Sequence, residues 1–159
     1  RRARSERVAA LAQAEGIDPQ IIRYILARLG DRQIISPTVS DNEILAHVMT
    51  GSDAVGKWRK SGNKLPALAW RITESGAPGR TASFTVLGVA HGPDKHYLAD
   101  VLKVVSSAGV ESSTVIDGDG YVLLLFRLTR KGRALDQNET DELLAKLRIL
   151  LVLPAESTA

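Results

Sequence analysis

The chain has 159 residues, of which 44% are apolar and 25% charged, and its formal net charge is +3. This composition indicates one large or two small globular domains and excludes a wholly disordered chain. The longest apolar run, Tyr121–Phe126, is far shorter than the about 20 residues of a membrane-spanning helix, and the lack of cysteine excludes disulfides and thiolate metal sites. We therefore expect a cytoplasmic protein without membrane contact.

An arginine-rich segment near the start of the chain predicts a first helix over residues 5–15. Its apolar residues Val8, Leu11 and Ala12 recur at helical spacing, so we expect them to face inward. Gly16 is expected to end this helix, because glycine commonly follows the last helical turn.

A second helix is predicted to begin at Asp18-Pro19 and to end at Gly30. Aspartate is a good N-cap, and proline is tolerated at the first helical position. The apolar residues that follow fall on one face of a helix. They are Ile21, Ile22, Ile25, Leu26 and Leu29.

The next segment predicts two short helices joined by a tight turn. Ser40 and Glu43 have the spacing of a capping box, in which each side chain binds a backbone N–H of the first turn. Thr50-Gly51 is interpreted as the turn, and the second of the two helices follows over residues 52–61.

The second half of the chain has the period of strands. After a strand over residues 68–73 and a hinge at 74–80, we predict strands at 82–89, 110–116, 121–128 and 149–153, and helices from Tyr97 and from Asp136. From residue 82 onward the order is β-α-β-β-α-β, the split pattern of ferredoxin-like domains, with 121–128 central. We therefore predict an α+β fold: a helical helix-turn-helix domain over residues 1–74, with or without a wing, and a ferredoxin-like dimerisation or ligand domain over 81–154.

Positive charge is concentrated in residues 54–80, which hold six basic residues and one acidic residue. Such an excess is typical of a surface that binds a polyanion. The helices on either side of Gly51 match a helix-turn-helix, whose second helix enters the major groove. With Val55 and Trp58 inward, the outer side would bind phosphates and base edges. The predicted nucleic-acid contacts are Ser52, Lys57, Arg59, Lys60, Lys64 and Arg71.

A second helix-turn-helix candidate lies upstream. It consists of residues at the sequence spacing that such motifs use. They are Ala12, Gly16, Ile17, Ile22 and Ile25. We expect only one of the two candidates to contact DNA. The downstream candidate is preferred because it carries more positive charge.

Two patterns typical of enzymes or metal sites are incomplete. Gly51–Lys57 spells the first part of a phosphate-binding loop, but Trp58 stands where serine or threonine would bind magnesium. His91 and His96 are five residues apart, whereas helical metal pairs favour a spacing of about four. We therefore expect no catalysis, no cofactor and no bound metal.

Three stretches resemble one family: Ile17-Asp18 with Ile25-Leu26, then Glu43–Ala46, then Asp117–Leu123. They are similar to the opening helices and the glycine–aspartate turn of Lrp/AsnC-type (feast/famine) transcription regulators. The resemblance implies a DNA-binding head, a C-terminal assembly domain and a small-molecule effector near that turn. The second half also resembles ACT domains, whose ligand-binding turn would be Gly92-Pro93-Asp94. The implied effector residues are Asp94, Gly118, Asp119 and Gly120.

These observations together predict a sequence-specific regulator that binds double-stranded DNA and is not an enzyme. We expect a homodimer or higher homo-oligomer, because one short recognition helix reads too few base pairs. The alternative is a non-catalytic assembly or accessory protein of phage or plasmid type that binds RNA or DNA without sequence preference. Tyr121 and Phe126 would then lie on the strand that carries stacking aromatics in RNA-recognition domains, although an aromatic content of 4% counts against stacking.

Overall fold

The computed structural model describes residues 2–31, 39–74 and 83–153. This part of the chain forms five helices: α1 (Arg2–Ala14), α2 (Pro19–Asp31), α3 (Asp41–Lys60), α4 (Leu98–Val105) and α5 (Gln137–Leu150). It also forms four strands: β1 (Ala67–Glu74), β2 (Ser83–His91), β3 (Gly109–Asp117) and β4 (Val122–Thr129). The fold is α+β, as predicted.

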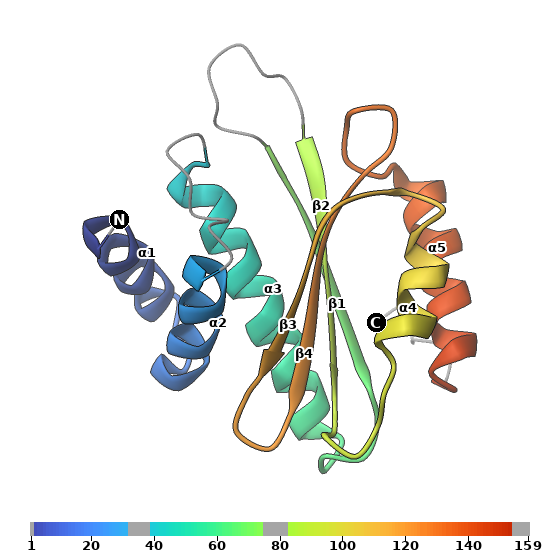
Figure 1. Cartoon of the computed structure of the whole chain (residues 1–159), viewed down its shortest axis with the longest axis horizontal. Coiled ribbons are helices and arrows are strands. Elements are labelled where there is room, and N and C mark those ends of the chain that lie inside the picture. Colours follow the sequence, from blue (N-terminus) through green and yellow to red (C-terminus); the bar gives the residue numbers. More distant parts are fainter. Residues whose placement is uncertain (1, 32–38, 75–82, 154–159) are drawn as a thin grey trace.

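The four strands form one antiparallel sheet in the order β1-β2-β4-β3. Figure 1 shows α1, α2 and α3 on one side of this sheet and α4 and α5 on the other. Alternate residues of a strand point to opposite faces, so each face has its own core. Leu123 and Leu125 belong to the core under α1–α3, and Leu124 and Phe126 to the core under α4 and α5. The prediction that residues 121–128 form a central strand is confirmed.

The two halves of the chain share this sheet and the core under α1–α3. β1 comes from the first half and pairs with β2 along its whole length, from Ala67 to Glu74. Ile25 and Val55 lie in the same core as Leu123 of β4. The boundary predicted between domains 1–74 and 81–154 therefore falls between β1 and β2, which are neighbouring strands of one sheet. The remainder of the predicted hinge, residues 75–80, lies outside the described residues.

The order β2-α4-β3-β4-α5 matches the first five elements of the predicted βαββαβ pattern. The predicted last strand over residues 149–153 is wrong, because Ile149 and Leu150 belong to α5 and Val152 has a φ of 55°. The edge beside β2 is filled by β1 instead. A short apolar run fits either a strand or the end of a helix, and long-range pairing decides between them.

α3 is one continuous helix of 20 residues, so the predicted turn at Thr50-Gly51 is wrong. Its capping box is confirmed: the Glu43 N–H donates to Ser40 Oγ, and the Ser40 N–H donates to the Glu43 carboxylate. Gly51 lies where α3 meets the sheet. A Cβ there would be 2.7 Å from Ile25 Cδ1 and 2.8 Å from Leu123 Cδ2. Glycine allows this close approach of helix and sheet.

Candidate nucleic-acid interface

Three of the six predicted nucleic-acid contacts line one shallow hollow between α3 and β1. Its volume is about 370 Å³, and we call it the α3–β1 groove. It is formed by Ser52, Asp53, Gly56, Lys57, Lys60, Ala69 and Trp70. Ser52, Lys57 and Lys60 are the predicted contacts among these, and Trp70 is an exposed residue that the sequence did not single out.

The cations of this region are engaged with the edge of the sheet. Lys57 Nζ donates to the Leu68 carbonyl at 3.0 Å and lies 5.5 Å from the centre of the Trp70 ring. Arg71 lies 3.4 Å from the Asp53 carboxylate. Both cations therefore help to fix α3 against β1. These contacts within the protein compete with the binding of a nucleic-acid phosphate.

The remaining predicted contacts lie elsewhere. Arg59 is 3.6 Å from the Asp18 carboxylate, and its guanidinium lies 5.6 Å from the centre of the Tyr121 ring. It is therefore placed beside the start of α2. Lys64 is exposed in the connection between α3 and β1. Because α3 is continuous, a helix-turn-helix around Gly51 is not formed, and Arg59 is engaged beside the start of α2, whereas Ser52, Lys57 and Lys60 line the α3–β1 groove.

The upstream segment does have a helix, a turn and a helix. Residues 15–18 connect α1 to α2, and Gly16 has a φ of 82°, which glycine adopts without steric cost. Asp18 Oδ1 accepts a hydrogen bond from the Gln20 N–H at 2.9 Å, as expected for the predicted cap of α2. The turn is therefore fixed at both ends by residues that the sequence pointed to.

The apolar residues at the motif positions of the upstream helix-turn-helix candidate face the core, as the packing of its two helices requires. Ala12, Ile22 and Ile25 are buried, and Ile17 packs half-buried against the same core. α1 packs on α2 and α3, while α2 also packs on α3 and β3. α2 is thus braced from behind by α1 and α3, as a recognition helix must be. The prediction that Leu11 faces inward is wrong, since its side chain is exposed.

The outer face of α2 carries polar residues. Gln20, Arg23 and Ala27 are exposed and share one face, because they lie at positions i, i+3 and i+7. Glutamine reads adenine and arginine reads guanine in the major groove. Gln20 and Arg23 were missed because charge favoured the downstream segment. The signal that could have found them is the set of offsets from Ala12 to Ile25.

Ion pairs fix α1 to the start of α3. Arg7 Nε donates to Asp41 Oδ2 at 2.9 Å, and Arg4 lies 3.4 Å from the same carboxylate. The hydrogen bond from Arg7 is the main cause of a pKa of Asp41 below its ordinary value. These contacts hold α1 in place behind α2.

The predicted effector turn is a tight hairpin between β3 and β4. The Gly118 N–H donates to the Tyr121 carbonyl at 2.9 Å, and Gly120 has a φ of 77°. A Cβ on Gly118 would collide with the Tyr121 ring. The Tyr121 ring therefore explains why residue 118 is a glycine, and the positive φ of the hairpin explains why residue 120 is one. An effector role for them, for Asp119 and for Asp94, which is exposed in the connection after β2, stays a prediction.

The aromatic residues of the RNA-binding alternative lie inside the molecule. Tyr121 is buried in the core under α1–α3, and Phe126 in the core under α4 and α5. Base stacking needs an exposed ring face. The interpretation of these two residues as stacking aromatics is therefore wrong.

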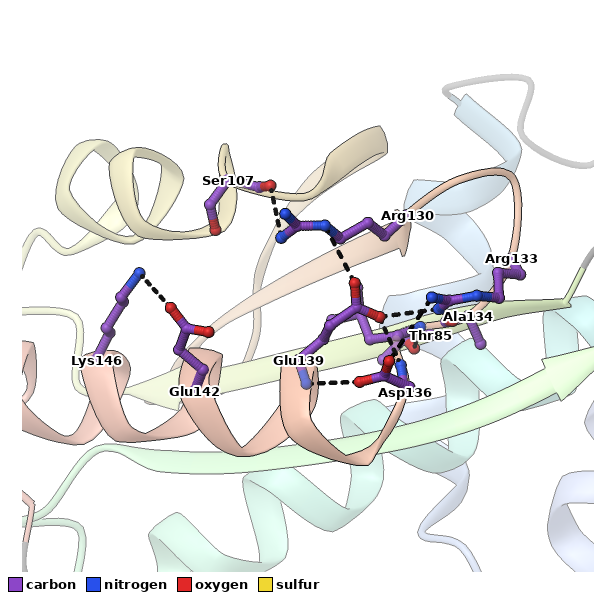
Figure 2. A network of polar contacts seen from close by, with 10 residues as sticks. Thr85, Ser107, Arg130, Arg133, Ala134, Asp136, Glu139, Glu142 and Lys146 are labelled. Carbon is purple, nitrogen blue, oxygen red and sulfur yellow. Dashed lines mark hydrogen bonds and ion pairs between the residues drawn. The ribbon is translucent and has the colours of Figure 1, made fainter.

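In a second basic segment, the turn after β4, two arginines pair with acidic residues at the start of α5. Arg130 and Arg133 lie 3.1 Å and 2.8 Å from the Glu139 carboxylate. Figure 2 shows both side chains converging on it. Glu139 also accepts from the Asp136 N–H at 2.9 Å and completes a capping box with it, so the predicted cap of α5 is confirmed. That backbone bond and Arg133 lower the pKa of Glu139. These cations hold the turn against α5.

The described ranges 2–31, 39–74 and 83–153 contain neither a candidate metal cluster nor a membrane-spanning helix. No group of three or more histidine, aspartate or glutamate side chains in them could hold a metal ion. His91 is buried, with Nδ1 2.7 Å from the Gly92 carbonyl and its ring edge-on to Tyr97. None of their helices combines the length and apolar character that crossing a bilayer requires.

Comparison of the chain with protein-family models, with curated proteins and with solved structures gives no significant match. The resemblance to Lrp/AsnC-type regulators therefore stays a prediction. The structural feature that bears on function is the helix-turn-helix candidate formed by α1 and α2, with the exposed polar face of α2.

Proposed function

We propose that the chain is a sequence-specific DNA-binding protein in which α2 enters the major groove. The observation that carries this proposal is the α1–α2 unit, with its positive-φ glycine turn, buried offsets and polar outer face. Gln20 and Arg23 would contact base edges. No step of chemistry is needed for this role.

The number of cations on α2 bears on how such a protein would work. Counter-ion release depends on how many Lys and Arg side chains meet phosphates, and α2 carries two arginines, Arg23 and Arg28. Useful affinity would then depend on base contacts made by two copies on a palindromic site. The homodimer follows from this need for two copies, whereas the further proposal of a cytoplasmic transcription regulator with a small-molecule effector rests on the resemblance to Lrp/AsnC-type regulators.

The proposal is tested by selecting binding sites from random duplex DNA. The affinity for the selected duplex is then compared with that for an unrelated duplex of equal length at one stated salt concentration. We expect Gln20→Ala and Arg23→Ala each to lower this ratio by about 5- to 150-fold, the loss of about 1–3 kcal/mol of base discrimination. Circular dichroism checks that both variants fold.

Two lysine variants serve as matched controls. Lys60→Ala removes a cation of the α3–β1 groove, and Lys146→Ala removes an exposed cation of α5, on the other side of the sheet. Both should leave the ratio unchanged. If Lys60→Ala lowers it while the α2 variants do not, the downstream segment is the contact and the proposal fails. Equal affinity for both duplexes would instead support an accessory protein without sequence preference.

A further inference from the structure

The two edges of the sheet are protected to different degrees. At the β3 edge, Arg28 of α2 donates to the Val115 carbonyl at 3.1 Å, and the strand has a bulge between Val110 and Ser112. At the β1 edge, Lys57 donates to the carbonyl of Leu68 near the start of the strand. Bulges and charged side chains are the usual means of blocking strand addition. Among the described residues, the Lys57 contact protects the first half of β1, and no backbone hydrogen bond is seen on the outer side of its second half.

The Leu68 contact also sets which backbone groups point outward. In an antiparallel pair, successive residues direct their N–H and C=O groups alternately toward the partner strand and away from it. Since the Leu68 carbonyl points away from β2, the backbone groups of Trp70, Ile72 and Glu74 do so too. No strand in the described part of the chain lies beside them.

Apolar side chains accompany these open groups. Leu68 is buried in the core under α4 and α5, so Trp70 and Ile72 project from the same face of the sheet. Their side chains are 36% and 58% exposed. An edge with outward hydrogen-bonding groups and exposed apolar residues is a template for another strand.

We propose that β1 pairs antiparallel with β1 of a second copy, with the two Ile72 residues opposite each other. In β1, only the even-numbered residues direct their backbone N–H and C=O groups away from β2. For hydrogen bonds to form between the two copies, even-numbered residues must therefore lie opposite even-numbered residues. Centring on Ile72 uses Trp70, Ile72 and Glu74 and spares the Leu68 carbonyl that Lys57 occupies. It also places Arg71 opposite Thr73, so that like charges do not meet.

Charge complementarity argues for a second copy as the occupant. In this register Glu74 of each copy lies opposite Trp70 of the other. Lys57 Nζ is 5.5 Å from the centre of the Trp70 ring, so each Glu74 carboxylate approaches the other copy's Lys57 ammonium. The pairing thus forms two identical ion pairs related by the two-fold axis, as a self-complementary interface requires.

The arrangement has a consequence that rests on the proposed function, although the pairing itself does not. Antiparallel edge pairing keeps the α1–α3 layers of both copies on the same face of an eight-stranded sheet. Seven strand spacings of about 4.8 Å then separate the two β3 strands, which is about 34 Å. Because α2 packs on β3, this separation is of the order of the 34–36 Å between successive major grooves, and the twist of the sheet would set how the two α2 helices face a duplex.

Sedimentation of the whole chain over a concentration series tests the pairing. We expect a monomer–dimer equilibrium that Ile72→Lys weakens about tenfold or more, since it sets two lysines against each other. Lys57→Glu and Glu74→Lys should each weaken it, and the double variant should restore it. Val110→Lys, on the β3 edge, is the matched control and should leave the equilibrium unchanged. A monomer at all concentrations, or a double variant no better than the singles, overturns the proposal.

A cross-link reports the register directly, because the chain has no cysteine. Ile72→Cys places two thiols across the axis, and we expect mild oxidation to give a covalent dimer. Val110→Cys should give none, and equal cross-linking of both variants would contradict the register. These variants leave Gln20 and Arg23 intact, so loss of the dimer and loss of base recognition are separate results.

Discussion

His47 is a buried ionisable residue held inside the core under α1–α3. Its Nδ1 lies 2.8 Å from the Glu43 carbonyl, and its Nε2 is buried without a hydrogen-bond partner among the described residues. The cation of Arg127, which pairs with Glu43 at 3.1 Å, adds repulsion. Burial is the main cause of a pKa of His47 below its ordinary value, and burial likewise lowers the pKa of His91. Both residues are therefore held neutral by the fold.

The two histidines predict a loss of stability in weak acid. Below about pH 6.5 the unfolded chain takes up protons on them that the folded protein does not, so the free energy of unfolding decreases as the pH falls. The slope is at most about 1.4 kcal/mol per pH unit for each residue. Urea unfolding between pH 7.5 and 5.5 measures it. His47→Gln should reduce the slope, and a slope that this variant leaves unchanged would contradict the expectation.

At the scale of elements, α3 shows why a glycine alone does not indicate a turn. Gly16 and Gly51 both follow helical patterns in the sequence. Gly16 has a positive φ and ends α1, whereas Gly51 lies inside α3 and brings the helix close to Ile25 and Leu123. Both uses of glycine follow from its missing Cβ.

We expect Gly51→Val to lower the free energy of unfolding by about 1–3 kcal/mol. The added methyl groups would overpack a site where the neighbouring side chains are fully buried. The matched control is Gly56→Val in the same helix, where a Cβ meets no atom within 4 Å. That variant should change stability by about 0.5 kcal/mol or less. Equal effects at both positions would contradict the close seating of α3 on the sheet.

At the scale of the whole molecule, the sheet depends on helices from both halves of the chain. Phe84, Val86, Leu123 and Leu125 are fully buried beneath α1–α3, while α4 and α5 cover only the opposite face. Exposing four such side chains costs about 6–12 kcal/mol, which is comparable with the total stability of a typical domain.

We therefore expect a fragment of residues 81–154, the predicted second domain, to lack a stable fold. The measurement is hydrogen exchange of its backbone amides, compared with the whole chain. The fragment should exchange without protection in β2 and β4, whereas the whole chain protects them. A cooperative unfolding transition in the isolated fragment would contradict this expectation and support two independent domains.

The sequence by itself determined the features that arise within a few residues. The Asp18 cap, the capping boxes at Ser40 and Asp136 and the hairpin at Gly118–Gly120 are all present. These signals are reliable because the groups that satisfy one another are close in the chain.

Only the tertiary structure decided what depends on distant partners. It made Gly51 a contact point, placed β1 at an edge and left residues 149–150 helical. The same applies to the candidate site. The sequence held both helix-turn-helix candidates, and charge favoured the wrong one for a turn. The continuity of α3, where it packs on the sheet, removed the downstream turn and left the turn at Gly16, because tertiary packing decides whether a helix is broken or continues past a glycine.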